Sequence, residues 1–116
     1  MLTLPPSVRL FVCVRPTDMR RGFDGLAGMA QTLLKRDPYC GHLFLFRNRR
    51  GDRIKVLYWD TDGFCVWYKR LEQGVFRFPA GLSDGAEMAL ADLHLLLEGI
   101  DPAKVKRLPR YRRASA

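Results

Sequence analysis

The feature that most constrains this chain is a series of short apolar and aromatic segments, separated by glycine-containing turns, between residues 42 and 78. Each segment has the length and the β-branched and aromatic content typical of a strand. Gly63, in one of the turns, can adopt the left-handed backbone conformation that a short hairpin loop needs. The pattern therefore predicts a four-stranded antiparallel β-meander that ends at Pro79. Its strands are expected at residues 42–46, 53–59, 64–70 and 75–78.

The segment before the meander predicts a strand followed by a helix. Residues 8–14 are rich in β-branched and aromatic side chains and predict an N-terminal strand that ends at Pro16. Thr17 or Asp18 can cap a helix that runs to about Arg36. Its apolar stripe has helical spacing and consists of Met19, Phe23, Leu26, Ala30 and Leu33.

Three glycines weaken the prediction of this first helix. Gly22, Gly25 and Gly28 each reduce helix stability by about 1 kcal/mol relative to alanine. Their spacing indicates either close packing against another backbone or a broken first turn.

A second helix is predicted after the meander. Ser83 or Asp84 can cap it, and Gly99 can end it just after Glu98. Its apolar stripe consists of Ala89, Leu93, Leu96 and Ile100.

These elements predict a single α+β domain. A chain of 116 residues can build one core but not two. We expect residues 1–103 to form an N-terminal strand and helix, a four-stranded antiparallel meander and a C-terminal helix packed on the sheet. Residues 104–116, rich in Lys and Arg, are predicted to form a flexible basic tail.

Composition argues against membrane and secreted classes. The sequence has no apolar run of about 18 residues and no N-terminal pattern of a secretion signal. Its three cysteines are odd in number and form no Cys-x-x-Cys motif, which argues against a disulfide framework. We expect a cytoplasmic protein without membrane association.

Charge is distributed unevenly along the chain. Residues 1–55 carry 11 Lys and Arg against 4 Asp and Glu, residues 56–103 carry 3 against 8, and residues 104–116 carry 6 against none. The basic parts favour a polyanion such as nucleic acid, and the acidic stretch suggests a second kind of partner. Of the 20 cations, 15 are Arg, which can contact phosphate and guanine with two hydrogen bonds. A GC-rich genome would also produce this bias.

The first turn of the meander and its flanks hold a basic cluster. Such a hairpin can enter a DNA groove or bind phosphates, or it can simply keep a sheet edge soluble. Trp59 and Trp67 flank the second turn and could pair across it, and an exposed pair could stack on bases. In a small sheet, however, most aromatic residues are needed for the core. The predicted DNA-binding residues are Arg47, Arg49, Arg50, Arg53, Lys55, Trp59, Trp67, Lys69, Arg70, Lys104, Lys106, Arg107, Arg110, Arg112 and Arg113.

Evidence for catalysis is weak. A metal-dependent nuclease needs several converging carboxylates, but Asp18 is explained as a cap and Asp60 and Asp62 as turn residues. Asp24 alone cannot hold two metal ions. Cys40 and the other cysteines match no common zinc-binding spacing. We therefore predict no catalytic residue, no metal and no cofactor.

Four blocks of the sequence resemble a known family. Residues 16–26 resemble the opening of the TnpB accessory proteins of insertion sequences of the sixty-six type, the products of the element's second open reading frame. Residues 41–55 and 58–71 resemble the second and third blocks of the family, and residues 95–101 its C-terminal block. The resemblance implies a role in transposition beside a separate transposase, and it implies no catalytic residues.

Two functions follow as hypotheses. The leading one is a non-enzymatic, DNA-binding accessory factor that acts with the transposase, with the ends of the element as the expected DNA. The alternative is a protein-interaction adaptor that binds the transposase and touches DNA little. Residues 84–101 contain five carboxylates and no Lys or Arg, so the second helix could contact a basic transposase surface or could simply remain solvated.

Overall fold

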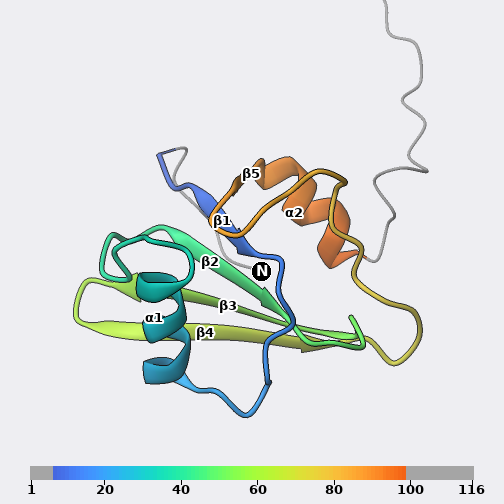
Figure 1. Cartoon of the computed structure of the whole chain (residues 1–116), viewed down its shortest axis with the longest axis horizontal. Helices are drawn as coiled ribbons and strands as arrows, with labels where there is room; N and C mark the ends of the chain where they lie inside the picture. The colour runs from blue at the N-terminus through green and yellow to red at the C-terminus, as the bar shows by residue number, and fades with distance from the viewer. Residues whose placement is uncertain (1–6, 99–116) are drawn as a thin grey trace, which may run out of the picture.

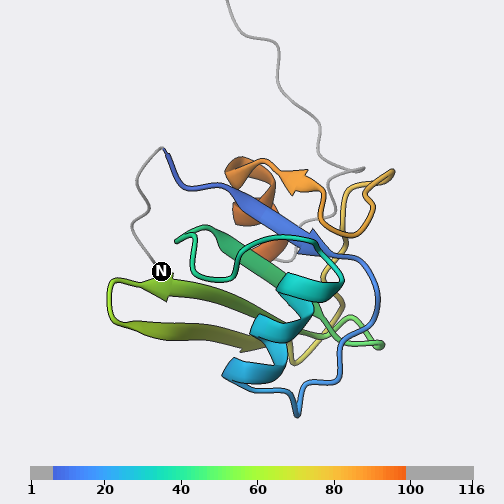
Figure 2. The same ribbon diagram turned by 60° about the vertical axis from the view of Figure 1, so that its left-hand side comes forward.

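The computed structural model describes residues 7–98. These residues form one five-stranded mixed sheet, in the order β4-β3-β2-β1-β5, with a helix on each face (Figures 1 and 2). The strands are β1 (Leu10–Cys13), β2 (Leu43–Arg47), β3 (Arg53–Asp60), β4 (Gly63–Arg70) and β5 (Glu87–Met88), and the helices are α1 (Phe23–Thr32) and α2 (Leu90–Leu97). In this described part, neither helix is long and apolar enough to cross a membrane.

The centre of the sheet is a parallel pair. β1 and β2 run in the same direction, with Leu10 opposite Leu43, and α1 forms the crossover between them, as parallel strands require. Alternate side chains of β1 enter different cores. Leu10 and Val12 pack with residues of α2, whereas Phe11 and Cys13 pack with residues of α1. Both strands are therefore covered on both faces.

Three strands of the predicted meander are confirmed, and the fourth prediction is wrong. β2, β3 and β4 are antiparallel neighbours. Residues 75–78 form no strand. Instead Phe76 is fully buried, and its N–H donates to the carbonyl oxygen of Gly51 at 2.7 Å. The chain therefore turns toward the β2–β3 turn after β4, and the fifth strand is β5, which pairs antiparallel with β1.

The first helix begins later than predicted, because its expected capping residue is used elsewhere. The carboxylate of Asp18 accepts hydrogen bonds from the backbone N–H of Arg20, at 2.9 Å, and from the Arg20 guanidinium. Gly22 occupies the N-cap in an extended conformation, and no side chain caps the helix. The structure contradicts close packing against another backbone, since a Cβ on Gly22 or Gly28 would meet no atom within 4 Å and one on Gly25 would meet only the Arg21 side chain.

The second helix is also shorter than predicted. Asp84 does not cap it, because its carboxylate accepts the N–H groups of Val14 and Arg15, at 2.7 and 3.2 Å, and pairs with the Arg15 side chain at 2.6 Å. This arrangement ties residues 84–88 to β1 and delays the helix to Leu90. The predicted apolar face is buried at Leu93 and Leu96, whereas Gly99, Ile100 and the basic tail lie outside the described residues.

Gly85 provides a test of this packing. Its φ is +81°, and a Cβ there would lie 2.8 Å from the backbone oxygen of Leu34. We expect Gly85→Ala to lower the free energy of unfolding by about 3 kcal/mol or more, through left-handed strain and backbone overlap together. Gly81 is the matched control, because its φ is +83° with nothing within 4 Å. In urea denaturation, Gly81→Ala should lower the free energy of unfolding by only about 1–2 kcal/mol. Equal losses in the two variants would contradict the packing argument.

Candidate nucleic-acid interface

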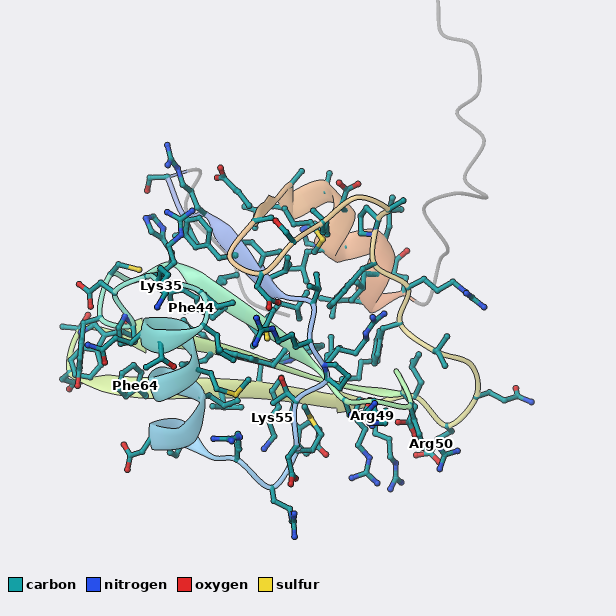
Figure 3. The ribbon with its side chains drawn as sticks, in the orientation of Figure 1. Lys35, Phe44, Arg49, Arg50, Lys55 and Phe64 are labelled. Atoms are coloured by element: carbon teal, nitrogen blue, oxygen red, sulfur yellow. The ribbon has the colours of Figure 1, made fainter. Side chains whose placement is uncertain are left out.

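The β2–β3 turn is fixed by its own hydrogen bonds. The Asn48 side chain donates to Asp52 at 2.7 Å and accepts the N–H of Arg53 at 3.0 Å. The bond from Asn48 is the main cause that holds the pKa of Asp52 below its usual value. Gly51 has a φ of +80°, which completes the turn. Arg49 and Arg50 consequently project into solvent from a well-held tip (Figure 3).

The loop before α1 lies beside this turn. The Lys55 ammonium donates to the carbonyl oxygens of Met19 and Arg21, both at 2.8 Å, and so anchors the loop to β3. A shallow groove of about 310 Å³ separates the two segments. Residues of both segments line it, namely Thr17, Asp18, Met19, Asn48, Arg49, Arg50, Asp52 and Arg53.

The loop adds two exposed arginines that the sequence analysis missed. Arg20 pairs with Asp18 at 2.6 Å, and this contact lowers the pKa of the Asp18 carboxyl to about 2. Arg21 is exposed next to it. Their adjacency within the basic half of the chain was a usable signal, but sequence alone did not place them beside the hairpin.

Three of the predicted DNA-binding cations donate hydrogen bonds to backbone carbonyl oxygens of other segments. The Arg47 guanidinium donates to the Phe76 carbonyl oxygen at 2.7 Å and lies 4.0 Å from the centre of a phenylalanine ring. Burial lowers its pKa. Lys55 holds the loop, and Lys69 donates to the carbonyl oxygen of Leu97 at the end of α2, at 2.8 Å. These side chains support the fold around the turn.

The other predicted cations on the sheet remain closer to solvent. Arg53 donates to the hydroxyl of Tyr68 at 3.2 Å, and Arg70 pairs with Glu72 at 2.8 Å on the surface. With Arg49 and Arg50 they form the basic end of the sheet. The tail cations Lys104, Lys106, Arg107, Arg110, Arg112 and Arg113 lie outside the described residues.

The expected pairing of the two tryptophans is wrong. Trp59 lies opposite Phe64, and Trp67 lies opposite Val56. Because side chains alternate along a strand and positions 56 and 59 differ by an odd number, the two indoles project from opposite faces. Trp67 packs against the core on the α2 side, and Trp59 lies at the end of β3 away from Arg53.

Other chemistry-bearing residues form no cluster. Among residues 7–98, no group of three or more His, Cys, Asp or Glu side chains could hold a metal ion. The three cysteines are free, and Cys40 is exposed. Cys13 is buried, and burial raises the pKa of its thiol.

Comparison with known proteins identifies relatives but no solved structure. A family model described as "IS66 Orf2 like protein" matches residues 8–107. An uncharacterized protein of Sinorhizobium fredii, y4jC, is 43% identical over 104 residues, which cover 89% of this chain and 88% of that protein. A second uncharacterized protein of Sinorhizobium fredii, y4hO, is 41% identical over 101 residues, which cover 87% of this chain and 88% of that protein. No solved structure matches significantly.

Replacement of Arg47 should destabilise the fold, whereas replacement of Arg49 should leave its stability nearly unchanged. Arg47→Ala removes a partly buried hydrogen bond and a cation–π contact, so we expect the free energy of unfolding to fall by about 1–3 kcal/mol. Arg49→Ala removes an exposed side chain and should change it by less than about 0.5 kcal/mol. Urea denaturation of both variants measures the difference, and a stable Arg47→Ala protein would show that Arg47 does not support the fold.

Proposed function

The chain belongs to the family of IS66 Orf2-like proteins, and from this membership we propose that it is a non-enzymatic, DNA-binding accessory factor of transposition. Membership in the family supports a role in the movement of an insertion sequence. We propose further that the protein contacts the ends of the element and acts beside a separate transposase.

The observation that carries DNA binding is the exposed pair Arg49 and Arg50 on a turn held by internal hydrogen bonds. Arg20 and Arg21 are exposed on the neighbouring loop, where Arg20 pairs with Asp18. Side chains on such a turn can meet phosphates without reorganising the backbone. Neutralising phosphates releases counterions from DNA, so the affinity depends on the number of cations that reach them.

The adaptor hypothesis loses part of its expected surface. Two carboxylates of the predicted acidic segment already have partners within the chain, because Asp84 pairs with Arg15 and Glu87 with Arg9. Leu93, Leu96 and Leu97 of α2 are buried on the sheet. Among the described residues, an acidic protein-binding face here would therefore depend on Asp92 and Glu98.

Charge reversal tests the hairpin. Arg49→Glu/Arg50→Glu should abolish binding to a duplex of the element ends without unfolding the domain, because the turn tip buries little surface. If about six cations of the wild type reach phosphates, the slope of log affinity against log salt is about −5, and Arg49→Ala/Arg50→Ala should reduce its magnitude by about 2. Fluorescence anisotropy over a salt series measures both effects.

The matched control for the alanine pair is Arg9→Ala/Lys35→Ala. It removes the same net charge, but both residues lie toward the opposite end of the sheet, as Figure 3 shows for Lys35. This control should bind DNA almost as the wild type does. Unchanged binding by a folded Arg49→Glu/Arg50→Glu protein would contradict the hairpin assignment.

The non-enzymatic part of the proposal has its own test. We expect the purified protein to cleave no element-end DNA with Mg²⁺ or Mn²⁺, since a two-metal reaction needs converging carboxylates. Asp24→Asn and Asp62→Asn should change stability only modestly. Metal-dependent cleavage by the wild type that is lost in either variant would overturn this part, whereas stimulation of a co-purified transposase would support it.

A further inference from the structure

Three aromatic rings meet at the end of the sheet opposite the basic hairpin. The ring centroids of Tyr39, Trp59 and Phe64 are 5.0–5.1 Å apart in all three pairings. Trp59 and Phe64 face each other across the β3–β4 hairpin, and Tyr39 reaches them from the loop between α1 and β2. We call these three residues the aromatic end.

Tyr39 is the exposed member of this cluster. Its side chain packs on two half-buried rings, yet the residue remains 59% exposed. Its N–H donates to the Asp37 carboxylate at 2.9 Å, so its backbone is tied into the turn that follows α1. The exposed tyrosine ring is therefore held in place over the indole and the phenyl ring.

Carboxylates surround the aromatic end. Asp60 and Asp62 are exposed in the β3–β4 turn, where the N–H of Asp62 donates to the Asp60 carbonyl oxygen, and Asp37 lies beside Tyr39. Lys35 is an exposed cation of the same loop and offsets one of these charges. Arg36 offsets a second charge, although its guanidinium donates to the Gly85 carbonyl oxygen and lies over the Phe11 ring. The immediate surroundings of the rings are therefore net negative.

The position of the aromatic end separates it from the predicted DNA contacts. β3 has eight residues from Arg53 to Asp60, which at about 3.3 Å per residue places its ends about 23 Å apart. Figure 3 shows Phe64 at one end of the sheet and Arg49 and Arg50 at the other. Phosphates would be repelled by the three carboxylates, so the surroundings of Trp59 disfavour a polyanion.

We propose that the aromatic end binds arginine side chains in a basic segment of a partner protein. A guanidinium stacks on aromatic faces and is attracted by them. Carboxylates nearby can accept two parallel hydrogen bonds from the same group. Arginine fits this surface better than lysine, because only its planar group can stack and make bidentate contacts together. This surface goes beyond the proposed DNA contact and does not depend on it.

The direct test is a titration of the ¹⁵N-labelled full chain with a hexa-arginine peptide, followed by NMR. The Trp59 indole N–H resonance should shift, and the Trp67 indole should not. Hexa-lysine carries the same charge and should bind at least about threefold more weakly, since it cannot stack in the same way.

Variants of one exposed residue sharpen the result. Tyr39→Ala should weaken hexa-arginine binding about fivefold, whereas Tyr39→Phe keeps the ring face and should retain most of the affinity. Phe23→Ala is the matched control, because Phe23 is an exposed aromatic residue (52%) on α1. If Tyr39→Ala does not fold, Asp62→Asn removes only charge and should weaken binding two- to threefold.

Three outcomes would overturn the proposal. They are equal affinity for the two peptides, resonance shifts confined to α2, and loss of DNA binding in Tyr39→Ala. The last outcome would assign the aromatic end to nucleic acid instead. Failure of the Arg49 and Arg50 variants to affect DNA binding would leave the peptide result unchanged, so the two proposals fail independently.

Discussion

The parallel pairing of β1 with β2 is the constraint on which the rest of the structure depends. Two parallel strands need a crossover between them, and this crossover places α1 on one face of the sheet. The strands are apolar on both sides, so the other face must also be covered. α2 and Phe76 provide that cover. The short β5 closes the open side of β1, and its tether through Asp84 is the reason why α2 begins only at Leu90.

Basic side chains are used in two ways around the hairpin. Arg47, Lys55 and Lys69 donate to backbone carbonyl oxygens of Phe76, of the loop before α1 and of the last turn of α2. An unpaired carbonyl oxygen is costly when it is buried, so these contacts stabilise the places where three segments end. They also hold the β2–β3 turn from several sides. Arg49 and Arg50 therefore extend from a turn that is already held in place. This reduces the conformational entropy that is lost when they bind a phosphate.

The hairpins could be predicted from sequence because their signals are local. Gly51 and Gly63 punctuate segments of strand composition, and β2, β3 and β4 were expected within one or two residues. Non-local pairing was harder. The uninterrupted apolar runs of β1 and β2 are typical of strands buried on both faces, and this signal of a parallel pair was not used. Residues 75–78 look like a strand, but the burial of Phe76 against the far core decides their path. The predicted helix caps were wrong for a similar reason. The carboxylates of Asp18 and Asp84 accept hydrogen bonds from other groups, which sequence spacing does not show.

The same limit applies to the candidate site. Clustering of arginines in the sequence pointed to the hairpin tip. It could not distinguish the exposed Arg49 from the partly buried Arg47, which lies only two positions before it. Strand alternation places Trp59 and Trp67 on opposite faces once the register is known, so a stacking pair was never available. Because β3 and β4 run continuously from the basic end to the aromatic end, the separation of about 23 Å between them cannot change without breaking the hairpin. A partner held at the aromatic end would thus be separated from a phosphate held by Arg49 or Arg50 by at least the length of β3. In the function proposed above, this spacing would set where a second protein stands relative to the DNA.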